Sequence, residues 1–340
     1  MVDIQFGNSM TKIYSILLFI ILSGGAITFG ETKTYTNPVM SKTRPDPCIV
    51  WNHNGDYFMY STSMAKTIPI YTSRNLIDWT YTADAFSPDQ MPTGIEGGGI
   101  WAPDVIEHNG KYLMAYAYSK GGEYHNNGIG LAIAEKPEGP FKNLGLLFTS
   151  DSSGVRNSID PALILDKGKL YLLWGSFHGL YMVELKQNKS GGYFIEDINS
   201  KVKVAGNAFE GSHIFKRGNY YYLFASVGRC CLKDNSSYRV VVGRSKNLLG
   251  PYIDETGRDM LDNGYNFVVG SNETFVGPGH GSTIITDKDG RTWYIYHSYI
   301  RGKGGQGRLP MLDEIKWTKE GWPYIYRGSP STVPTIGPNL

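Results

Sequence analysis

Apolar and polar residues alternate along most of the chain, and the alternation is organised in hairpin-sized units. Each unit has a polar first residue, an apolar run, a turn that contains glycine, and an aromatic run that ends in a small polar residue. The units are residues 46–63, 101–119, 159–176, 210–226 and 279–298. Period-two alternation on both sides of a glycine turn is typical of a β-hairpin. The pattern therefore predicts five similar hairpins.

Further strand-like runs lie between the hairpins, at residues 68–73, 128–135, 179–185 and 238–245. Two more strands for each hairpin would complete a four-stranded sheet, and no convincing helical repeat interrupts the series. Because such sheets bury their faces only against one another, five of them predict a closed all-β fold, the five-bladed β-propeller. A β-sandwich is the alternative, but it would not explain five similar hairpins. No linker divides residues 33–340, which we expect to form a single domain.

Prolines stand at the start of the first strand in the hairpins, as in the stretch Arg44-Pro45-Asp46-Pro47. Proline cannot donate a ladder hydrogen bond, so it is confined to strand starts and edge strands. We therefore expect the first strand of each sheet to line the central channel of the propeller. Counted back from the turn glycine, the polar first residues stand at similar offsets and share one level: Asp46, Asp160, Glu210 and His280, with Trp101 facing them.

Composition and charge narrow the class of partner. The chain has 340 residues, with 33 Lys and Arg against 31 Asp and Glu, and no basic run stands out. Nucleic acid is therefore not an expected partner. An isolated aspartate before proline is more often a turn residue, but three carboxyl groups at one level favour catalysis. Carboxylates held close together move each other's pKa apart, so that one serves as a base and another as an acid, as in glycoside hydrolysis.

Aromatic residues near the same level are candidates to stack on sugar rings. They are Trp101, Trp174 and Phe177. Packing in the core is the alternative for each of them, and for Trp174 the two interpretations stay equally open.

The N-terminus predicts export. Lys12 precedes an apolar run at residues 13–22, and small residues follow, so residues 1–30 are expected to be a signal peptide. The apolar run has about ten residues, which is too short to span a bilayer, and no other segment approaches that length. We expect a monomeric protein without a membrane span, in the periplasm or outside the cell.

The chain has three cysteines, Cys48, Cys230 and Cys231, so at least one thiol is unpaired within it. Adjacent cysteines have Cα atoms ~3.8 Å apart, which is below the usual disulfide range of ~4.4–6.8 Å. A bridge between Cys230 and Cys231 would be strained. We therefore expect buried free thiols.

Several motifs together resemble glycoside hydrolase family 43, most of all its arabinan endo-1,5-α-L-arabinanases. They are RPDP at 44–47, GGIWAPDV at 98–105, NSIDPALI at 157–164, WGSF at 174–177, EGSHIFKRGNYYYLF at 210–224, GRCC at 228–231, SYRVVVGRS at 237–245 and GPGHGS at 277–282. Each motif alone is weakly specific, but their order and spacing together are highly specific. The motifs extend over nearly the whole mature chain.

The resemblance implies an inverting hydrolase of α-1,5-linked arabinan or arabino-oligosaccharides from plant cell walls. It implies that Asp46 is the general base, that Glu210 is the general acid, and that Asp160 tunes the pKa and the orientation of the acid. The candidate substrate-binding residues are Trp101, Asn157, Ser176, Phe177 and Arg308. His280 matches a histidine that holds Ca²⁺ or a similar hard cation, largely through water. The alternative for His280 is a hydrogen bond to the carboxylates.

Departures from the family pattern leave the mode of attack open. Gly281 stands where an asparagine is usual in this group, and Gly211-Ser212 stands where many arabinanases have Ala-Pro. Two long segments, residues 85–99 and 254–274, are candidates to wall the groove and to convert endo into exo attack.

The alternative functions are an exo-acting arabinanase, and an α-L-arabinofuranosidase or β-xylosidase on other pentose polysaccharides. A binding propeller without catalysis would be expected to lack one of the carboxylates, and a retaining fructan-type propeller would need Asn-Asp-Pro where this chain has Arg44-Pro45-Asp46-Pro47.

Overall fold

The structure is a computed structural model that describes residues 33–63, 67–92, 98–119, 127–281 and 283–340. The predicted signal peptide lies outside these residues. The described residues between 33 and 340 form one compact unit. None of the helices in the described ranges is long and apolar enough to cross a membrane.

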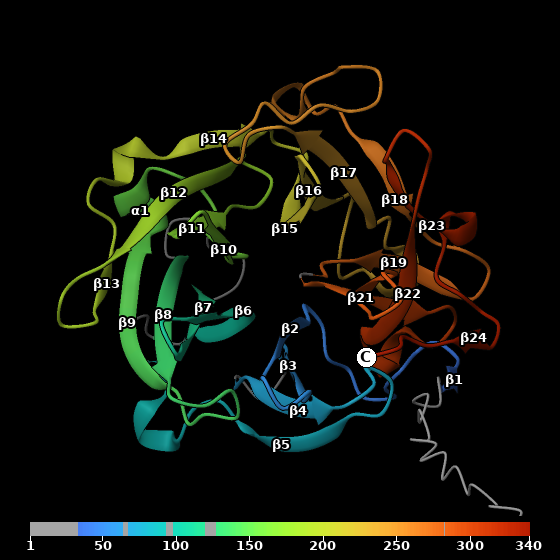
Figure 1. Cartoon of the computed structure of the whole chain (residues 1–340), viewed down its shortest axis with the longest axis horizontal. Coiled ribbons are helices and arrows are strands. Elements are labelled where there is room, and N and C mark those ends of the chain that lie inside the picture. The colour runs from blue at the N-terminus through green and yellow to red at the C-terminus, as the bar shows by residue number, and fades with distance from the viewer. Residues whose placement is uncertain (1–32, 64–66, 93–97, 120–126, 282) are drawn as a thin grey trace, which may run out of the picture. The chain divides into compact units, whose positions relative to one another are not determined.

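Within the described residues, five antiparallel sheets surround a common centre, and their inner strands point toward it (Figure 1). Blade one contains β2 (Cys48–Trp51), β3 (Tyr57–Tyr60), β4 (Pro69–Ser73) and β5 (Thr80–Asp84). Blade two contains β6 (Gly99–His108), β7 (Lys111–Ser119), β8 (Gly128–Ala134) and β9 (Lys142–Thr149). Blade three contains β10 (Ala162–Asp166), β11 (Lys169–Trp174), β12 (Leu180–Gln187), β13 (Tyr193–Phe194) and β14 (Val202–Ala205).

The second half of the chain continues the same architecture. Blade four contains β15 (Glu210–Arg217), β16 (Tyr220–Val227), β17 (Arg239–Ser245) and β18 (Asn266–Val269). Blade five contains β19 (Phe275–Gly279), β20 (Ile284–Thr286), β21 (Thr292–Ile300), β22 (Leu309–Trp317) and β23 (Pro323–Ile325). Each predicted hairpin is the inner pair of strands of one blade. The prediction of an all-β, five-bladed propeller is confirmed.

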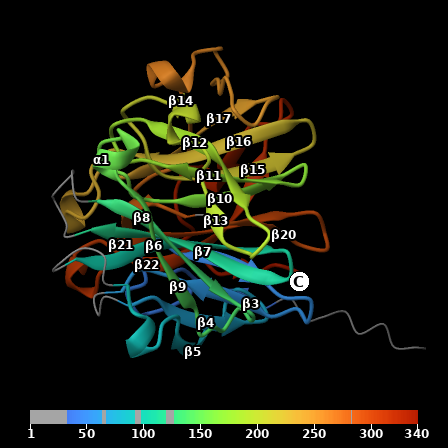
Figure 2. The ribbon, with the colours of Figure 1, turned by 90° about the vertical axis from the view of Figure 1, so that its left-hand side faces the viewer.

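Helices are short and connect the strands. They are α1 (Ser150–Ser153) and the 3₁₀ helices η1 (Pro88–Gln90), η2 (Ile198–Ser200), η3 (Lys233–Asn235), η4 (Met260–Asp262), η5 (Gly304–Gln306) and η6 (Tyr326–Gly328). The outermost strands form the rim, and the side view of Figure 2 brings β9 of blade two toward the viewer.

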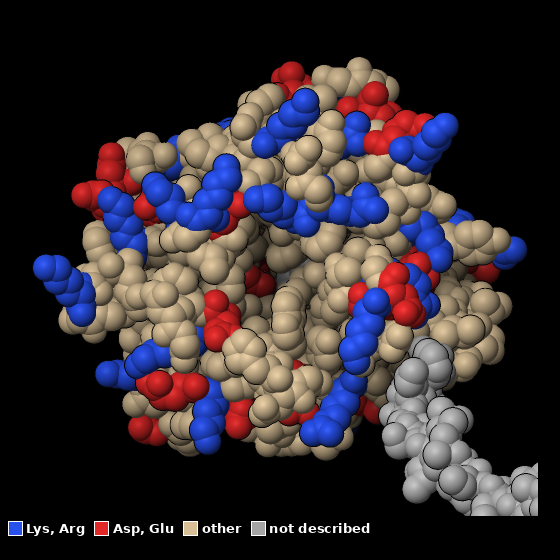
Figure 3. All heavy atoms as spheres, viewed as in Figure 1, with Lys and Arg blue, Asp and Glu red and all other residues tan. Residues whose placement is uncertain are grey.

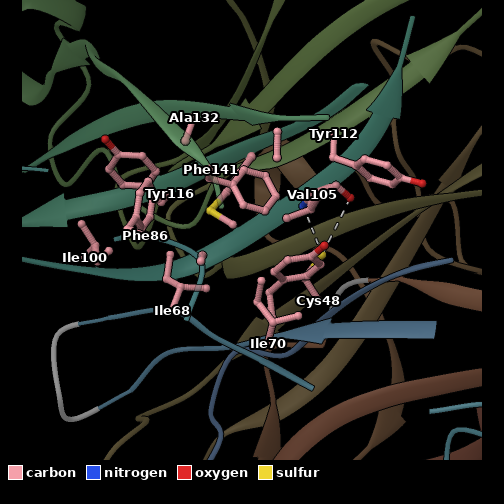
Figure 4. Close-up of a cluster of buried hydrophobic side chains, with 14 of the residues drawn as sticks. Cys48, Ile68, Ile70, Phe86, Ile100, Val105, Tyr112, Tyr116, Ala132 and Phe141 are labelled. Carbon is pink, nitrogen blue, oxygen red and sulfur yellow. Dashed lines mark hydrogen bonds between the residues drawn. The ribbon is translucent and has the colours of Figure 1, made fainter. Parts of the chain in front are cut away.

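The core consists of five apolar clusters, and each cluster in the described residues joins two neighbouring blades. The cluster between blades one and two packs Cys48, Ile68 and Ile70 against Tyr116 and Phe141 (Figure 4). Because the two faces of a blade are both covered in this way, its strands carry long apolar runs where a half-exposed sheet would alternate strictly. Blade-to-blade packing fixes the inner strands, and with them the residues around the channel.

The ends of the chain meet at the closure of the ring. Strand β1 (Thr34–Tyr35) pairs with β24 (Thr335–Ile336), and the buried hydroxyl of Tyr35 donates a hydrogen bond of 2.6 Å to the carbonyl of Leu312 in blade five. The last apolar cluster packs blade five against blade one around Trp293. The first and last blades are thus joined through side chains and through a short two-stranded sheet.

Candidate active site

A pocket of about 810 Å³ is lined by residues from all five blades. Its walls include Asp46, Trp101, Asp160, Glu210 and His280, one from each blade. Figure 3 shows the molecular face hollowed near its centre, with acidic atoms visible in the depth of the hollow. The structure therefore brings together the polar residues that the strand pattern assigned to a common level.

The backbone φ angles show which residue of each blade occupies that level. Asp46, Asp160 and His280 have φ values of 55°, 56° and 42°, in the left-handed region where Asp and His are enriched among non-glycine residues. In blades two and four the left-handed residue is Ala102 or Gly211. Trp101 and Glu210 come one residue earlier than these. The glycine offsets identified the right neighbourhood but did not reveal this shift of one residue.

Asp46 is surrounded by donors. The hydroxyl of Thr62 donates a hydrogen bond of 2.7 Å to its Oδ2, and Nη1 of Arg308 donates one of 3.0 Å to its Oδ1. Nδ1 of His280 lies 3.3 Å from the same Oδ1. Burial alone would raise the pKa of Asp46, but Arg308, the two nearby histidines and Thr62 together hold it below its ordinary value. This carboxylate is therefore ionised at neutral pH and is suited to accept a proton.

Glu210, in contrast to Asp46, has a raised pKa. Burial, followed by the repulsion of Asp160, raises its pKa to about 7, while hydrogen bonds from Ser176 and Tyr238 oppose the shift. The Ser176 hydroxyl donates to Oε2 of Glu210 over 2.7 Å. A carboxyl group with this pKa carries its proton through most of the acidic range and can deliver it near neutrality.

Asp160 lies beside the acid. Its Oδ2 accepts a hydrogen bond of 3.2 Å from the backbone N–H of Gly211, the residue that follows Glu210. Burial and the charge of Asp46 raise the pKa of Asp160 to about 8. The hydrogen bond to Gly211 fixes the strand that carries Glu210, and the electrostatic coupling of the two carboxyl groups keeps the pKa of Glu210 high.

Sequence reasoning missed two residues that support this site, His297 and Tyr238. His297 is fully buried, and its Nδ1 accepts a hydrogen bond of 3.1 Å from the backbone N–H of Asp46. Its ring stacks on that of Tyr238, with centroids 6.0 Å apart and planes at 12°. A signal existed for His297, because it directly precedes Ser298, the small polar residue that ends the fifth hairpin.

The candidate substrate-binding residues separate into two groups. Trp101, Phe177 and Arg308 line the pocket. Asn157 and Ser176 are buried beside it and are not among the lining residues. Oδ1 of Asn157 accepts a hydrogen bond of 2.5 Å from Nδ2 of Asn127, and Nδ2 of Asn157 donates one of 3.3 Å to the carbonyl of Ser176. Their geometry indicates that they support the wall and the acid, and that neither faces a ligand directly.

Burial decides the role of Trp174, and position in the fold decides the role of the segment 254–274. Trp174 is fully buried and packs on Phe148, with ring centroids 5.0 Å apart, so it is a core residue. The expectation that residues 254–274 wall the groove is wrong, because this segment contains η4 and β18, the outermost strand of blade four, and contributes no lining residue. In the segment 85–99, Gly99 lines the pocket, and residues 93–97 lie outside the described part of the chain.

The expectation of buried free thiols holds for one cysteine. Cys48 is fully buried, whereas Cys230 is partly exposed and Cys231 is exposed, and both of these line the pocket. Both residues lie between the end of β16 and η3, in a connection that lines the pocket.

The potential metal-binding side chains nearest to His280 are those of Asp46 and Asp160. Within the described residues, no group of three or more His, Cys, Asp or Glu side chains is arranged to hold a metal ion. Ca²⁺ prefers six to eight oxygen ligands. One imidazole near Asp46 and Asp160 does not supply such a set, so the protein donors alone do not fit a resident calcium ion.

One pocket thus holds an ionised carboxylate and a carboxyl group of raised pKa, the pair of groups that glycoside hydrolysis uses. Residues 35–323 match the family model of glycosyl hydrolases family 43, and the chain belongs to this family.

Similar proteins include enzymes of two modes of action. An extracellular exo-α-(1→5)-L-arabinofuranosidase of Cellvibrio japonicus is 32% identical over 302 residues, which cover 81% of this chain and 85% of that protein. An extracellular endo-α-(1→5)-L-arabinanase of Bacillus subtilis is 33% identical and covers 67% of this chain and 69% of its own length. The solved structure of an α-L-arabinanase of Cellvibrio cellulosa in complex with arabinohexaose has a TM-score of 0.71, with 28% identity over 86% of this chain and 96% of that one.

Proposed function

We propose that the protein is an inverting hydrolase that cleaves α-1,5-L-arabinofuranosidic bonds in arabinan. The observation that carries the proposal is the pairing of an ionised Asp46 with a Glu210 whose pKa is raised to about 7, in one pocket. The names of the relatives supply the sugar and the linkage.

In the proposed reaction, Asp46 accepts a proton from a water molecule, and the oxygen of that water attacks the anomeric carbon. Glu210 donates its proton to the glycosidic oxygen as the bond to the leaving sugar breaks. Arg308 orients Asp46 through the hydrogen bond to Oδ1. Asp160 keeps Glu210 protonated before the step and holds its strand in place.

Two substitutions separate the proposed roles. Asp46→Asn and Glu210→Gln should each lower the rate of arabinan hydrolysis by about 10²–10⁴-fold, because each removes one proton transfer. With an aryl arabino-oligosaccharide, whose leaving group needs little protonation, Glu210→Gln should regain much of its rate and Asp46→Asn should not. Near-normal arabinan hydrolysis by either folded variant would reject the assignment.

We propose endo attack, with exo attack as the second candidate because the Cellvibrio japonicus relative is named as an exo-acting enzyme. Product analysis over time on linear arabinan distinguishes them, since endo attack gives a ladder of oligomers and exo attack gives one product from the start. Equal hydrolysis of xylan would instead favour a β-xylosidase. The NMR spectrum of the first product tests inversion at the anomeric carbon.

Three further points remain proposals: export through the predicted signal peptide, a monomeric state, and a cation held near His280 through water. For the cation, thermal stability and activity are measured after chelation and after addition of Ca²⁺, with His280→Gln as the control. Unchanged stability and activity after chelation would remove calcium from the description of this protein.

A further inference from the structure

The loop after β16 places a pair of adjacent thiols in the wall of the catalytic pocket. Cys230 and Cys231 are free cysteines, and both line the pocket together with Arg229. Cys231 is exposed and Cys230 is partly exposed. The proposed hydrolysis uses neither of these thiols.

The guanidinium of Arg308 connects the thiols to the catalytic carboxylate. Its Nη1 lies 3.6 Å from Sγ of Cys230 and 3.0 Å from Oδ1 of Asp46. A group attached to Cys231, the residue after Cys230, would therefore enter the pocket that contains the general base. It would occupy space that a saccharide in the pocket needs.

The two thiols are not equivalent. The hydrogen bond from Cys230, assisted by Arg308 and opposed by burial, holds the pKa of Cys231 below its ordinary value. The same hydrogen bond, together with burial, raises the pKa of Cys230. Since the thiolate is the nucleophile in thiol chemistry, an exposed Cys231 beside a protonated Cys230 and a cation has the environment of a reactive cysteine.

We propose that Cys231 is a covalent modification site within the pocket, at which small disulfides react and block the binding of saccharide. The blocking part rests on the proposed function, whereas the reactivity of Cys231 does not.

The chemistry is a thiol–disulfide exchange. The Cys231 thiolate attacks one sulfur of a small disulfide R–S–S–R, a bond forms between Cys231 and that sulfur, and the other half leaves as RS⁻. The disulfide is the oxidant, so no other electron acceptor is required. Attack by Cys230 on the mixed disulfide would expel the second RS⁻ and form a bridge between adjacent residues. The ~3.8 Å between adjacent Cα atoms, below the usual ~4.4 Å limit, disfavours that bridge, so the mixed disulfide should persist.

Cys48 provides a matched control in the same chain. It lies at the start of β2, is fully buried in the cluster between blades one and two, and its Sγ accepts a hydrogen bond of 3.2 Å from the backbone N–H of Val105 (Figure 4). The native protein should not expose this thiol to a disulfide in solution.

The experiment treats the native protein with the chromogenic disulfide dithionitrobenzoate. A single adduct at Cys231 is expected from the mass of the intact protein and of its peptides, with Cys48 labelled only after denaturation. Hydrolysis of arabinan should fall on the order of 100-fold, because an adduct in the pocket misplaces the substrate, and dithiothreitol should restore it. Linear arabino-oligosaccharide should slow the labelling.

The variants are compared with their own untreated activity. Cys231→Ser should lose both the labelling and the inhibition, while Cys48→Ser should behave as the unsubstituted protein does. Labelling first at Cys48 or Cys230, or full labelling of Cys231 without loss of hydrolysis, would overturn the proposal. If the untreated protein does not hydrolyse arabinan, the proposed function fails, and the site of labelling still decides whether Cys231 is the reactive thiol.

Discussion

Two carboxyl groups of the pocket, Glu210 and Asp46, should be visible in the pH dependence of hydrolysis, because their surroundings separate their pKa values. The value of kcat/KM is expected to fall about tenfold per pH unit above pH 7, as Glu210, with its pKa raised to about 7, loses the proton that it must donate. The acidic limb should lie below the ordinary range of an aspartate, since the pKa of Asp46 is lowered. Initial rates across the pH range test this, and a rate that still rises with pH above neutrality would contradict it.

Two substitutions should move the alkaline limb in opposite directions. Ser176→Ala removes a hydrogen bond that favours the ionised form of Glu210, so the pKa of Glu210 rises and the limb moves to higher pH. Asp160→Asn removes the negative charge that Asp160 gains as it ionises near pH 8 and that raises the pKa of Glu210, so the limb moves to lower pH. Profiles of kcat/KM for both variants provide the measurement. A shift of both limbs in the same direction would show that the two residues do not act on the charge of Glu210.

At the residue scale, the sequence identified the candidate catalytic side chains but not the hydrogen bonds that position them. Asp46, Asp160, Glu210 and His280 were found because each stands at a similar offset from a turn glycine within its own hairpin. The partners of Asp46 come from the far end of the chain, since Arg308 is 262 residues away and His297 is 251 residues away. A local pattern cannot pair such residues, because only the closure of the ring brings them together.

At the scale of single strands, the start of β15 depends on a glycine. Gly211 has a φ of 54°, and a Cβ at this position would lie 2.7 Å from Cγ of His280. Gly211→Ala should therefore cost about 1–3 kcal/mol of folding stability and displace His280, or Glu210 next to the substitution, with a fall in kcat. Denaturant unfolding and steady-state kinetics measure the two effects.

The matched control is a glycine whose added Cβ would meet nothing. Gly168 has a comparable φ of 76°, and no atom lies within 4 Å of the added Cβ, so Gly168→Ala should lower stability without changing kcat. If Gly211→Ala retained full activity and stability, the contact with His280 would not be significant. The same close contact means that the Ala-Pro pair that the family resemblance led us to expect at 211–212 would require His280 to move.

The strands that the sequence predicted best are the inner ones. Their apolar runs are bounded by a proline-bearing start and a glycine turn, so β2, β3, β6 and β7 were delimited within a few residues. The outer strand β18 was missed, because it contains only Asn266–Val269 and is half exposed. An outer strand packs on one side and ends without a turn signal, so its pattern resembles that of a loop. The segment around β18 was for this reason mistaken for a wall of the groove.

For the molecule as a whole, stability depends on closing the ring. Each blade buries its faces against two neighbours, so an opened ring would expose the apolar cluster between blades five and one. The repeat count of five predicted the closure but not how the chain achieves it. The pairing of β1 with β24 involves two residues on each side, too few to leave a recognisable pattern in the sequence.

Tyr35 tests the closure of the ring. It is buried, packs edge-on against Trp293 with ring centroids 6.5 Å apart, and donates its hydroxyl to Leu312 in blade five. Tyr35→Ala should lower the free energy of unfolding by about 3–5 kcal/mol, as expected for the loss of a buried aromatic side chain. Tyr35→Phe removes only the hydrogen bond and should cost about 1 kcal/mol. Ile336→Ala, at an exposed position of the partner strand, should have little effect.

Denaturant unfolding of the three variants measures these differences, and the pH profile of the folded enzyme should not move, because Tyr35 does not line the pocket. The expected cost decreases from Tyr35→Ala, which loses a buried aromatic ring, to Tyr35→Phe, which loses one hydrogen bond, and then to Ile336→Ala, which changes an exposed side chain. If Tyr35→Ala were as stable as the unsubstituted protein, the contacts between blades themselves would close the ring, and the terminal strands would have no part in it. A loss of cooperativity in Tyr35→Ala alone would instead mean that the blades separate before they unfold.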